Sequence, residues 1–319
     1  MKLISDERKQ HELGMACAIL CALLWGVLPI YWKSIQSIDS LLIMFYRLVL
    51  ACILVFVVGL IKYKWKGVIG PLKEKGAIPA FFIAGLIIST NWGLYIWMVN
   101  AGYIIQTSIG YYIEPLMICV FGIVFFKEKP ERYKIAAILL ALLGVCVMLF
   151  SYGEIPVLAL ALAVTFATYA AIKKRLNAPA LLALFYETVF LAPFAIVIIL
   201  YMELSGKGAF TTAEPPQIAL LFLSGLFTAI PLSLFAMAAN RISLVALGVT
   251  EYISPSISLV LGIFIYKEGF DLYQFIGFCI IWVGLIVFTV GGICEHKILQ
   301  SQWKKEEEAL AGETDEGLL

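Results

Sequence analysis

The sequence has little charge and almost no histidine. Asp, Glu, Lys and Arg make up 14% of the 319 residues, whereas a soluble domain carries about 25%. The two histidines, His11 and His296, both lie outside the apolar runs. The formal net charge of +1 gives no reason to expect a nucleic-acid partner. So few polar side chains exclude an ordinary soluble domain and make a lipid bilayer the expected surroundings.

Motifs of common catalytic and metal sites are also absent. The chain has no HExxH or HxxxH pair for a metal and no GxxxxGK[ST] loop for a nucleotide. Its seven cysteines form no CxxC pair and lie mostly in apolar runs, so we interpret them as small packing residues. We therefore expect no metal, no cofactor and no enzymatic activity. An integral-membrane enzyme that modifies lipids or small molecules, or a channel, stays the alternative.

Long apolar runs are what the chain has instead. Hydrophobic residues make up 62% of it, and the mean hydropathy is +0.96. A helix of about 20 apolar residues spans a bilayer. We find ten such runs, at residues 15–32, 40–61, 77–99, 103–126, 133–150, 155–173, 180–202, 215–238, 242–266 and 272–294. The predicted fold is an all-α polytopic membrane protein with ten transmembrane helices. Polar tails cover residues 1–14 and 295–319, and we expect the second tail to form a short, fraying helix.

Lys and Arg predict the orientation, because they concentrate in cytoplasmic loops. With the N-terminus inside, the inner segments carry 19 of these residues, the outer loops carry 3, and Arg47 lies within a span. This asymmetry predicts an even number of spans and both termini in the cytoplasm.

A motif in the fourth run recurs in the ninth, 140 residues later. Residues 111–115 read YYIEP and residues 251–255 read EYISP. In both copies a Gly and a Lys-Glu pair follow the Pro at the same spacing: Gly122 with Lys127-Glu128, and Gly262 with Lys267-Glu268. Other matches at this offset are Phe45 with Phe185, Gly85 with Gly225, and Gly144 with Gly284. We predict two five-helix repeats, at residues 15–150 and 155–294. An odd number of spans makes the second repeat inverted relative to the first.

Two carboxylates lie deep in these runs. Glu114 is ~16 Å from the outer end of its span and Glu251 is ~14 Å from the inner end of its own, so both fall near the midplane. An ionised carboxylate there needs a cation, a proton or water. We predict that they bind protons or a cationic substrate. The alternative is a protonated carboxyl with one interhelical hydrogen bond. Two close carboxylates in a weakly hydrated site cannot both ionise cheaply, so we expect at least one to bind and release a proton during transport.

Further candidates surround these carboxylates. Arg47, ~10 Å from the outside, is a candidate for a substrate contact or for a structural ion pair with Glu114 or with its repeat counterpart Glu187. The aromatic and amide candidates for the substrate site are Trp25, Asn91, Trp92, Tyr95, Tyr111, Tyr112 and Tyr252. The candidates for hinges and close helix packing are Pro115, Pro255, Gly122, Gly248 and Gly262. For the Lys-Glu pairs we consider only orientation or gating, because a surface ion pair contributes little.

Several of these residues resemble a known family. The residues that carry the resemblance are Asn91-Trp92, Trp97, Ser108-Ile109-Gly110-Tyr111, Pro115-Leu116, Pro231-Leu232, Phe235, Tyr252, Pro255 and Glu268. They are similar to the RarD branch of the EamA drug/metabolite transporters, and the resemblance covers residues 14–292. It implies a ten-helix carrier of the bacterial inner membrane, driven by an ion gradient or by substrate exchange.

We therefore predict a secondary active transporter, a permease or exporter, of small organic metabolites or drugs. Inverted repeats around a midplane site suit alternating access. The expected partners are a small-molecule substrate, the lipid bilayer and protons as the candidate coupling ion. Self-association as a homodimer stays open.

Overall fold

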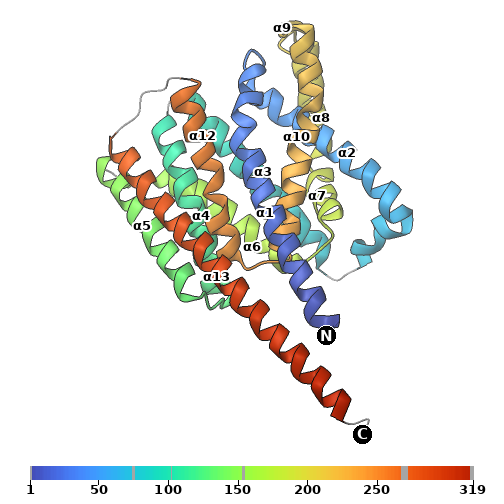
Figure 1. Ribbon diagram of the computed structural model, residues 1–319. Coiled ribbons are helices and arrows are strands. Elements are labelled where there is room, and N and C mark those ends of the chain that lie inside the picture. The colour runs from blue at the N-terminus through green and yellow to red at the C-terminus, as the bar shows by residue number, and fades with distance from the viewer. Residues whose placement is uncertain (1, 74–75, 102, 153–154, 267–271, 317–319) are drawn as a thin grey trace.

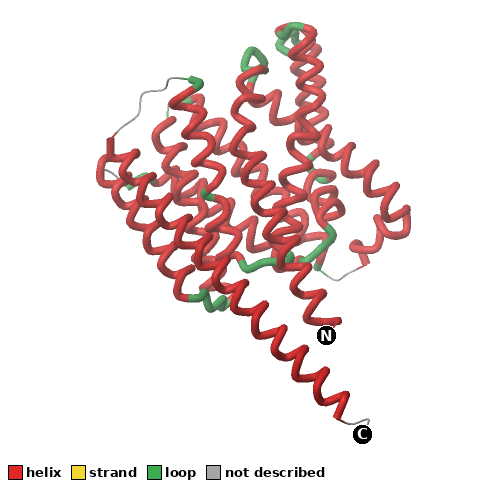
Figure 2. The backbone as a smooth tube through the Cα atoms, in the orientation of Figure 1, coloured by secondary structure: helices red, strands yellow, loops and turns green. Residues whose placement is uncertain are grey.

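The computed structural model describes residues 2–73, 76–101, 103–152, 155–266 and 272–316. Within these ranges the regular structure is helical, and no strand is present (Figures 1 and 2). The helices are α1 Lys2–Ser34, α2 Ser40–Ile69, the short 3₁₀ helix Gly70–Lys73, α3 Ala77–Asn100, α4 Ile104–Phe126, α5 Arg132–Tyr152, α6 Val157–Leu176, α7 Ala180–Val189, α8 Ala192–Leu204, α9 Ala209–Thr212, α10 Pro215–Ala239, α11 Leu244–Glu251, α12 Ile253–Phe264 and α13 Leu272–Glu316.

Ten helical segments of the described chain are long and apolar enough to cross a membrane, which confirms the predicted fold. The seventh run differs in detail. It was predicted as one helix over residues 180–202, but a break at Phe190 and Leu191 divides it into α7 and α8. Pro193 explains the break, because proline lacks the backbone N–H of a helical hydrogen bond and its ring crowds the preceding turn.

The packing of the helices follows the two inverted repeats. Three helices pack directly on their counterparts in the other half: α5 on α13, α4 on α11, and α2 on α7. The other contacts occur in equivalent pairs. The contact of α1 with α10 is equivalent to that of α6 with α3. The contact of α4 with α6 is equivalent to that of α12 with α1. The contact of α2 with α10 is equivalent to that of α7 with α3. An exchange of the two halves therefore reproduces the same set of neighbours.

The crossing of α5 and α13 shows this symmetry at the level of residues. A Cβ added to Gly144 would lie 2.6 Å from the backbone oxygen of Gly277, and one added to Gly284 would lie 3.1 Å from that of Ala137. Gly284 is the counterpart of Gly144, and Ala137 is the counterpart of Gly277, both at the offset of 140. The same contact, seen from opposite halves, is what a two-fold axis in the membrane plane produces.

The two halves differ where the repeated motif lies. α4 continues as one helix through Pro115. Its counterpart is divided at Tyr252 into α11 and α12, three residues before Pro255. All eight residues of α11 are buried, whereas α12 has no buried residue. The half-helix α11 is thus part of the core, and the break lies beside the predicted site.

The two ends of the chain lie at the same end of the bundle (Figure 1). α13 continues past its membrane span to Glu316, so the C-terminal tail is a long helix and not the short one expected. Its residues beyond 296 are mostly Lys, Glu, Gln, Leu and Ala, which are strong helix formers, and none is Pro. The second Lys-Glu pair, Lys267-Glu268, lies outside the described residues.

Candidate functional site

Arg47, the cation predicted inside the second span, lies on α2 against aromatic rings. Its guanidinium carbon is 4.0 Å from the centre of the Trp92 ring and 5.3 Å from that of Trp32. A cation over an aromatic face is attracted by the electron density of the ring. Tyr95 and Tyr111 are close enough to interact with Arg47 electrostatically. We call these five residues the arginine cluster.

The arginine cluster joins α1, α2, α3 and α4. The ring centres of Tyr95 and Tyr111 are 5.7 Å apart, and Tyr111 keeps 41% of its surface exposed. The Nε atom of Arg47 is buried and has no hydrogen-bond partner. Among the described residues no carboxylate forms an ion pair with Arg47. The ion pair with Glu114 or Glu187, one of the two alternatives considered for Arg47, is therefore not formed in this structure, and the cluster offers a buried donor beside flat aromatic surfaces.

The two predicted carboxylates lie on neighbouring helices. Glu251 is the last residue of α11 and is 4% exposed. Its Oε1 atom is buried without a hydrogen-bond partner. Glu114, half-buried on α4, is close enough to act on Glu251 electrostatically and also acts on Tyr111 of the arginine cluster. The fold thus brings the two carboxyl groups together, and Tyr111 interacts with both Glu114 and Arg47.

The counterparts Tyr112 and Tyr252 meet where the halves touch. The Tyr252 hydroxyl donates a hydrogen bond of 2.9 Å to the backbone oxygen of Tyr112. The ring of Tyr112 packs edge-on against Phe278, with 4.6 Å between ring centres. A Cβ on Gly248 would lie 2.6 Å from the backbone oxygen of Pro115, so Gly248 permits the close approach of α11 and α4. These residues position the backbone on either side of Glu114 and Glu251.

The other predicted packing residues lie in the two copies of the repeated motif, on α12 and near the end of α4. Pro255 and Gly262 belong to α12 and are only half-buried. Gly122 lies near the end of α4, where a Cβ would be 2.7 Å from Oε2 of Glu128 and 2.9 Å from the Cβ of Leu244. Gly122 therefore leaves room for a carboxylate between α4 and the start of α11.

Asn91 and Trp25 have partners of their own outside the arginine cluster. The buried Asn91 amide donates to the backbone oxygen of Leu162 at 2.8 Å and to Oγ1 of Thr165 at 2.9 Å, which ties α3 to α6. Trp25 packs against Phe235, with ring centres 5.6 Å apart, inside the core cluster of α1, α6 and α10. Both side chains hold the helices that surround the site.

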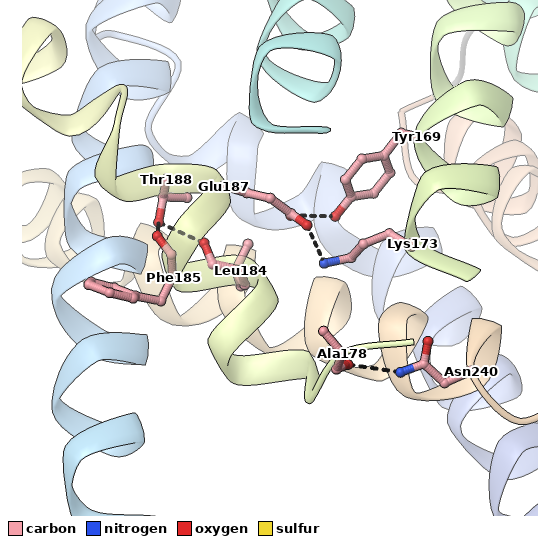
Figure 3. A network of polar contacts seen from close by, with 8 residues as sticks. All are labelled: Tyr169, Lys173, Ala178, Leu184, Phe185, Glu187, Thr188 and Asn240. Atoms are coloured by element: carbon pink, nitrogen blue, oxygen red, sulfur yellow. Dashed lines mark hydrogen bonds and ion pairs between the residues drawn. The ribbon is translucent and has the colours of Figure 1, made fainter. Parts of the chain in front are cut away.

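Glu187 forms a separate buried network (Figure 3). One carboxylate oxygen lies 2.7 Å from Nζ of Lys173, and the other accepts a hydrogen bond of 3.1 Å from the Tyr169 hydroxyl. Lys173 is 3% exposed and Glu187 is 1% exposed. Sequence reasoning placed Lys173 in a cytoplasmic segment and missed this pair. The available signal was the short connection at residues 177–179, which turns the chain back and lets a basic residue near the end of α6 reach α7.

A cavity of about 540 Å³ lies at the end of the bundle where the chain begins. It is enclosed by α1, α2, α10 and the connection between α6 and α7. None of the predicted site residues lines it. Its lining has two cations, several amide and hydroxyl groups and no carboxylate: Gln10, Lys62, Tyr63, Asn177, Ala178, Pro179, Ala180, Leu181, Ser233, Met237, Asn240 and Arg241.

Known proteins share this arrangement. The model of the EamA-like transporter family matches residues 12–150 and 155–290, one match for each repeat. The chain is 37% identical to an uncharacterized transporter, YojE, of Bacillus subtilis, over 94% of this chain and 98% of that protein. It is 30% identical to the protein RarD of Escherichia coli, over 90% and 97% respectively. A solved crystal structure shares the fold, with a TM-score of 0.68, 18% identity and coverage of 88% and 98%.

Ten apolar helices in two inverted repeats, together with bacterial transporter relatives, define a polytopic membrane transporter of the bacterial inner membrane. The chain belongs to the EamA-like transporter family and is similar to its RarD members. The family and the names of the relatives indicate transport rather than catalysis.

Proposed function

We propose that this protein is a secondary active transporter that moves small organic metabolites or drugs across the inner membrane by alternating access, with both termini in the cytoplasm. The observation that carries the proposal is a pair of buried polar atoms without partners, Nε of Arg47 and Oε1 of Glu251. Buried polar groups are nearly always hydrogen-bonded, and in a membrane an unpaired one is still less favourable. Such unpaired atoms, one on α2 of the first repeat and one on α11 of the second, are suited to a ligand that comes and goes.

The chemistry of the arginine cluster indicates how a substrate is held. The guanidinium of Arg47 donates hydrogen bonds to an acceptor oxygen, and a planar substrate stacks on Trp92, Tyr95 or Tyr111. Glu251 and Glu114 are too close for both to ionise cheaply in apolar surroundings. One of them therefore takes up a proton in one access state and releases it in the other, which couples transport to the proton gradient.

Transport by the purified protein in liposomes tests this function. We expect one class among amino acids, aromatic metabolites and amphenicols to accumulate against its gradient when a pH gradient is imposed. An Arg47→Gln variant should lose affinity for that substrate roughly tenfold or more, since it loses hydrogen bonds from a charged donor. Uptake that needs no gradient and does not saturate would instead indicate a channel.

Reporter fusions test the proposed orientation. Fusions at residues 10 and 300 should both report the cytoplasm, because 19 Lys and Arg lie in the segments assigned to that side and 3 in those assigned to the other. An external signal from either fusion would contradict the orientation.

A further inference from the structure

The start of α11 is a buried helix end. The first backbone N–H groups of a helix have no partner within the helix and need one from outside. Ser243 supplies one acceptor, since its hydroxyl accepts from the N–H of Ala246 at 3.1 Å. The carboxylate of Glu128 supplies the others: it accepts from the N–H of Leu244 at 2.8 Å and from that of Val245 at 3.0 Å. One half of the molecule thus caps a helix of the other half.

The repeated motif shapes the end of α4 for this contact. Lys127 adopts a left-handed backbone conformation, with φ of 53°, and turns the chain back at the end of the helix. The N–H of Glu128 then bonds to the backbone oxygen of Gly122 at 3.1 Å. Gly122 has no side chain, and a Cβ there would lie 2.7 Å from the Glu128 carboxylate. The Gly and the Lys-Glu pair of the first copy therefore act together to aim one carboxylate at α11.

A third helix secures the cap. Lys174, near the end of α6, lies 3.4 Å from Oε1 of Glu128 and donates a hydrogen bond of 2.6 Å to the backbone oxygen of Ile242. The ammonium group balances the charge of the buried carboxylate and holds the loop before α11. The ends of α4 and α6 and the start of α11 are thereby joined by charge-assisted hydrogen bonds, which are the strong ones.

The other end of α11 carries Glu251. With eight residues, α11 is ~12 Å long, and all of them are buried. Close packing along its length includes Gly248 against Pro115 and a contact of 3.4 Å from Sγ of Cys119 to the backbone oxygen of Val245. Such a short, fully packed helix moves as a rigid piece. A shift at its capped end is therefore transmitted to Glu251.

We propose that Glu128 is a positioning residue for Glu251: by capping α11 from the end of α4, it fixes where the Glu251 carboxylate lies relative to Glu114. This goes beyond the orientation or gating role considered for the Lys-Glu pair, and it rests on the proposed function for the part that Glu251 plays in transport. A residue that only stabilised the fold would leave the pH dependence of transport unchanged. A positioning residue displaces it, because the distance between the two carboxylates sets how strongly the charge of one disfavours ionisation of the other.

Cys119 provides a measurement that needs no substrate. Its buried thiol faces α11, and a buried thiol reacts only when its surroundings open. We expect Glu128→Ala to raise the rate of N-ethylmaleimide labelling of Cys119 roughly tenfold or more, as expected for the loss of hydrogen bonds to a charged acceptor. Glu131→Gln removes a carboxylate three residues away that pairs with the nearby Lys134, and should leave the rate unchanged. Cys294, which is exposed at the end of the last span, reports equal reagent access in each variant.

The pH dependence of transport in liposomes completes the test. Glu128→Gln keeps one acceptor oxygen and serves if the Ala variant fails to fold. We expect Glu128→Gln to displace the midpoint of the pH–rate profile. The control Glu131→Gln should have the same midpoint as the parent protein. Unchanged Cys119 labelling in both Glu128 variants would overturn the proposal, as would faster labelling with the parent pH profile, which would make Glu128 a structural cap only. If the parent transports without any pH dependence, the proposed function of Glu251 fails, while the labelling still decides whether Glu128 holds α11.

Discussion

The fourth and ninth spans contain two copies of the same motif, yet the fourth is one continuous helix and the ninth is divided into two. α4 passes through Pro115 without interruption, whereas its counterpart is divided at Tyr252 into α11 and α12. A proline removes one helical hydrogen bond in both. Whether the helix then breaks depends on its neighbours. α11 is enclosed by the core and capped by Glu128, but α12 has no buried residue, so the two pieces are held independently.

This difference makes the two carboxylates unequal. Glu114 lies in the middle of a continuous helix, next to Pro115. Glu251 lies at the C-terminal end of a short helix, where the unsatisfied backbone carbonyls carry a partial negative charge. In the proposed coupling, Glu251 is therefore the residue that we expect to hold and release the proton.

The largest effect should come from neutralising that residue. Gln keeps the size of Glu and can hydrogen-bond, but it cannot carry a proton on and off. We expect Glu251→Gln to abolish proton-driven accumulation at near-normal expression, and Glu114→Gln to weaken it to a lesser degree. Accumulation in liposomes across a series of pH gradients measures both.

Substrate counterflow separates coupling from binding in these variants, since exchange need not move a proton. It should survive in Glu251→Gln. Parent-like accumulation and pH dependence in both Gln variants would show that neither carboxylate couples transport, and an equal loss in both would remove the distinction between α4 and α11.

The next effect concerns Arg47 and Glu187, which occupy equivalent positions in the two halves. Glu187 is paired with Lys173 and Arg47 has no ion-pair partner in the described chain. Removing one member of a buried pair leaves the other uncompensated and costs roughly 3–5 kcal/mol. We expect Glu187→Gln to lower the stability of the protein in detergent by about that amount, measured by thermal unfolding. Arg47→Gln should instead lower the affinity for substrate. A double variant, Glu187→Leu with Lys173→Met, should regain stability. If Arg47→Gln destabilises as much as Glu187→Gln, Arg47 is structural.

The smallest predicted effect tests the symmetry of the contact between α5 and α13. A methyl group at Gly144 would press on a backbone oxygen at 2.6 Å, and one at Gly284 would meet its counterpart at 3.1 Å. Overpacking of this kind costs roughly 1–3 kcal/mol, and more where the added group meets a closer atom. Gly144→Ala should therefore be the more destabilising in thermal unfolding. If Gly284→Ala destabilises the protein more than Gly144→Ala, the contact between α5 and α13 differs from the one described.

Sequence alone was enough for the ten spans and the inverted repeats, because hydropathy, charge asymmetry and a fixed offset report them directly. It also predicts a similar depth for Glu114 and Glu251, since depth can be counted along a helix. Sequence reasoning failed where the neighbours of a residue depend on its position around the helix bundle and not on its depth. Depth made Glu114 the nearest partner for Arg47, whereas the cation packs on Trp92 and Trp32. The cap by Glu128 was equally out of reach, because it joins residues 116 positions apart in the chain.

The hydrogen bond from Tyr252 to Tyr112 has a consequence for how such a protein arises. In a homodimer of five-helix subunits a contact between equivalent residues would come in two copies. Here one copy is present among the described residues, and Tyr112 packs on Phe278 instead. Fusion of duplicated genes releases each subunit from being identical to its mate. Once the two copies can differ, one ancestral position holds the unpaired Arg47 in the first half and Glu187, paired with Lys173, in the second.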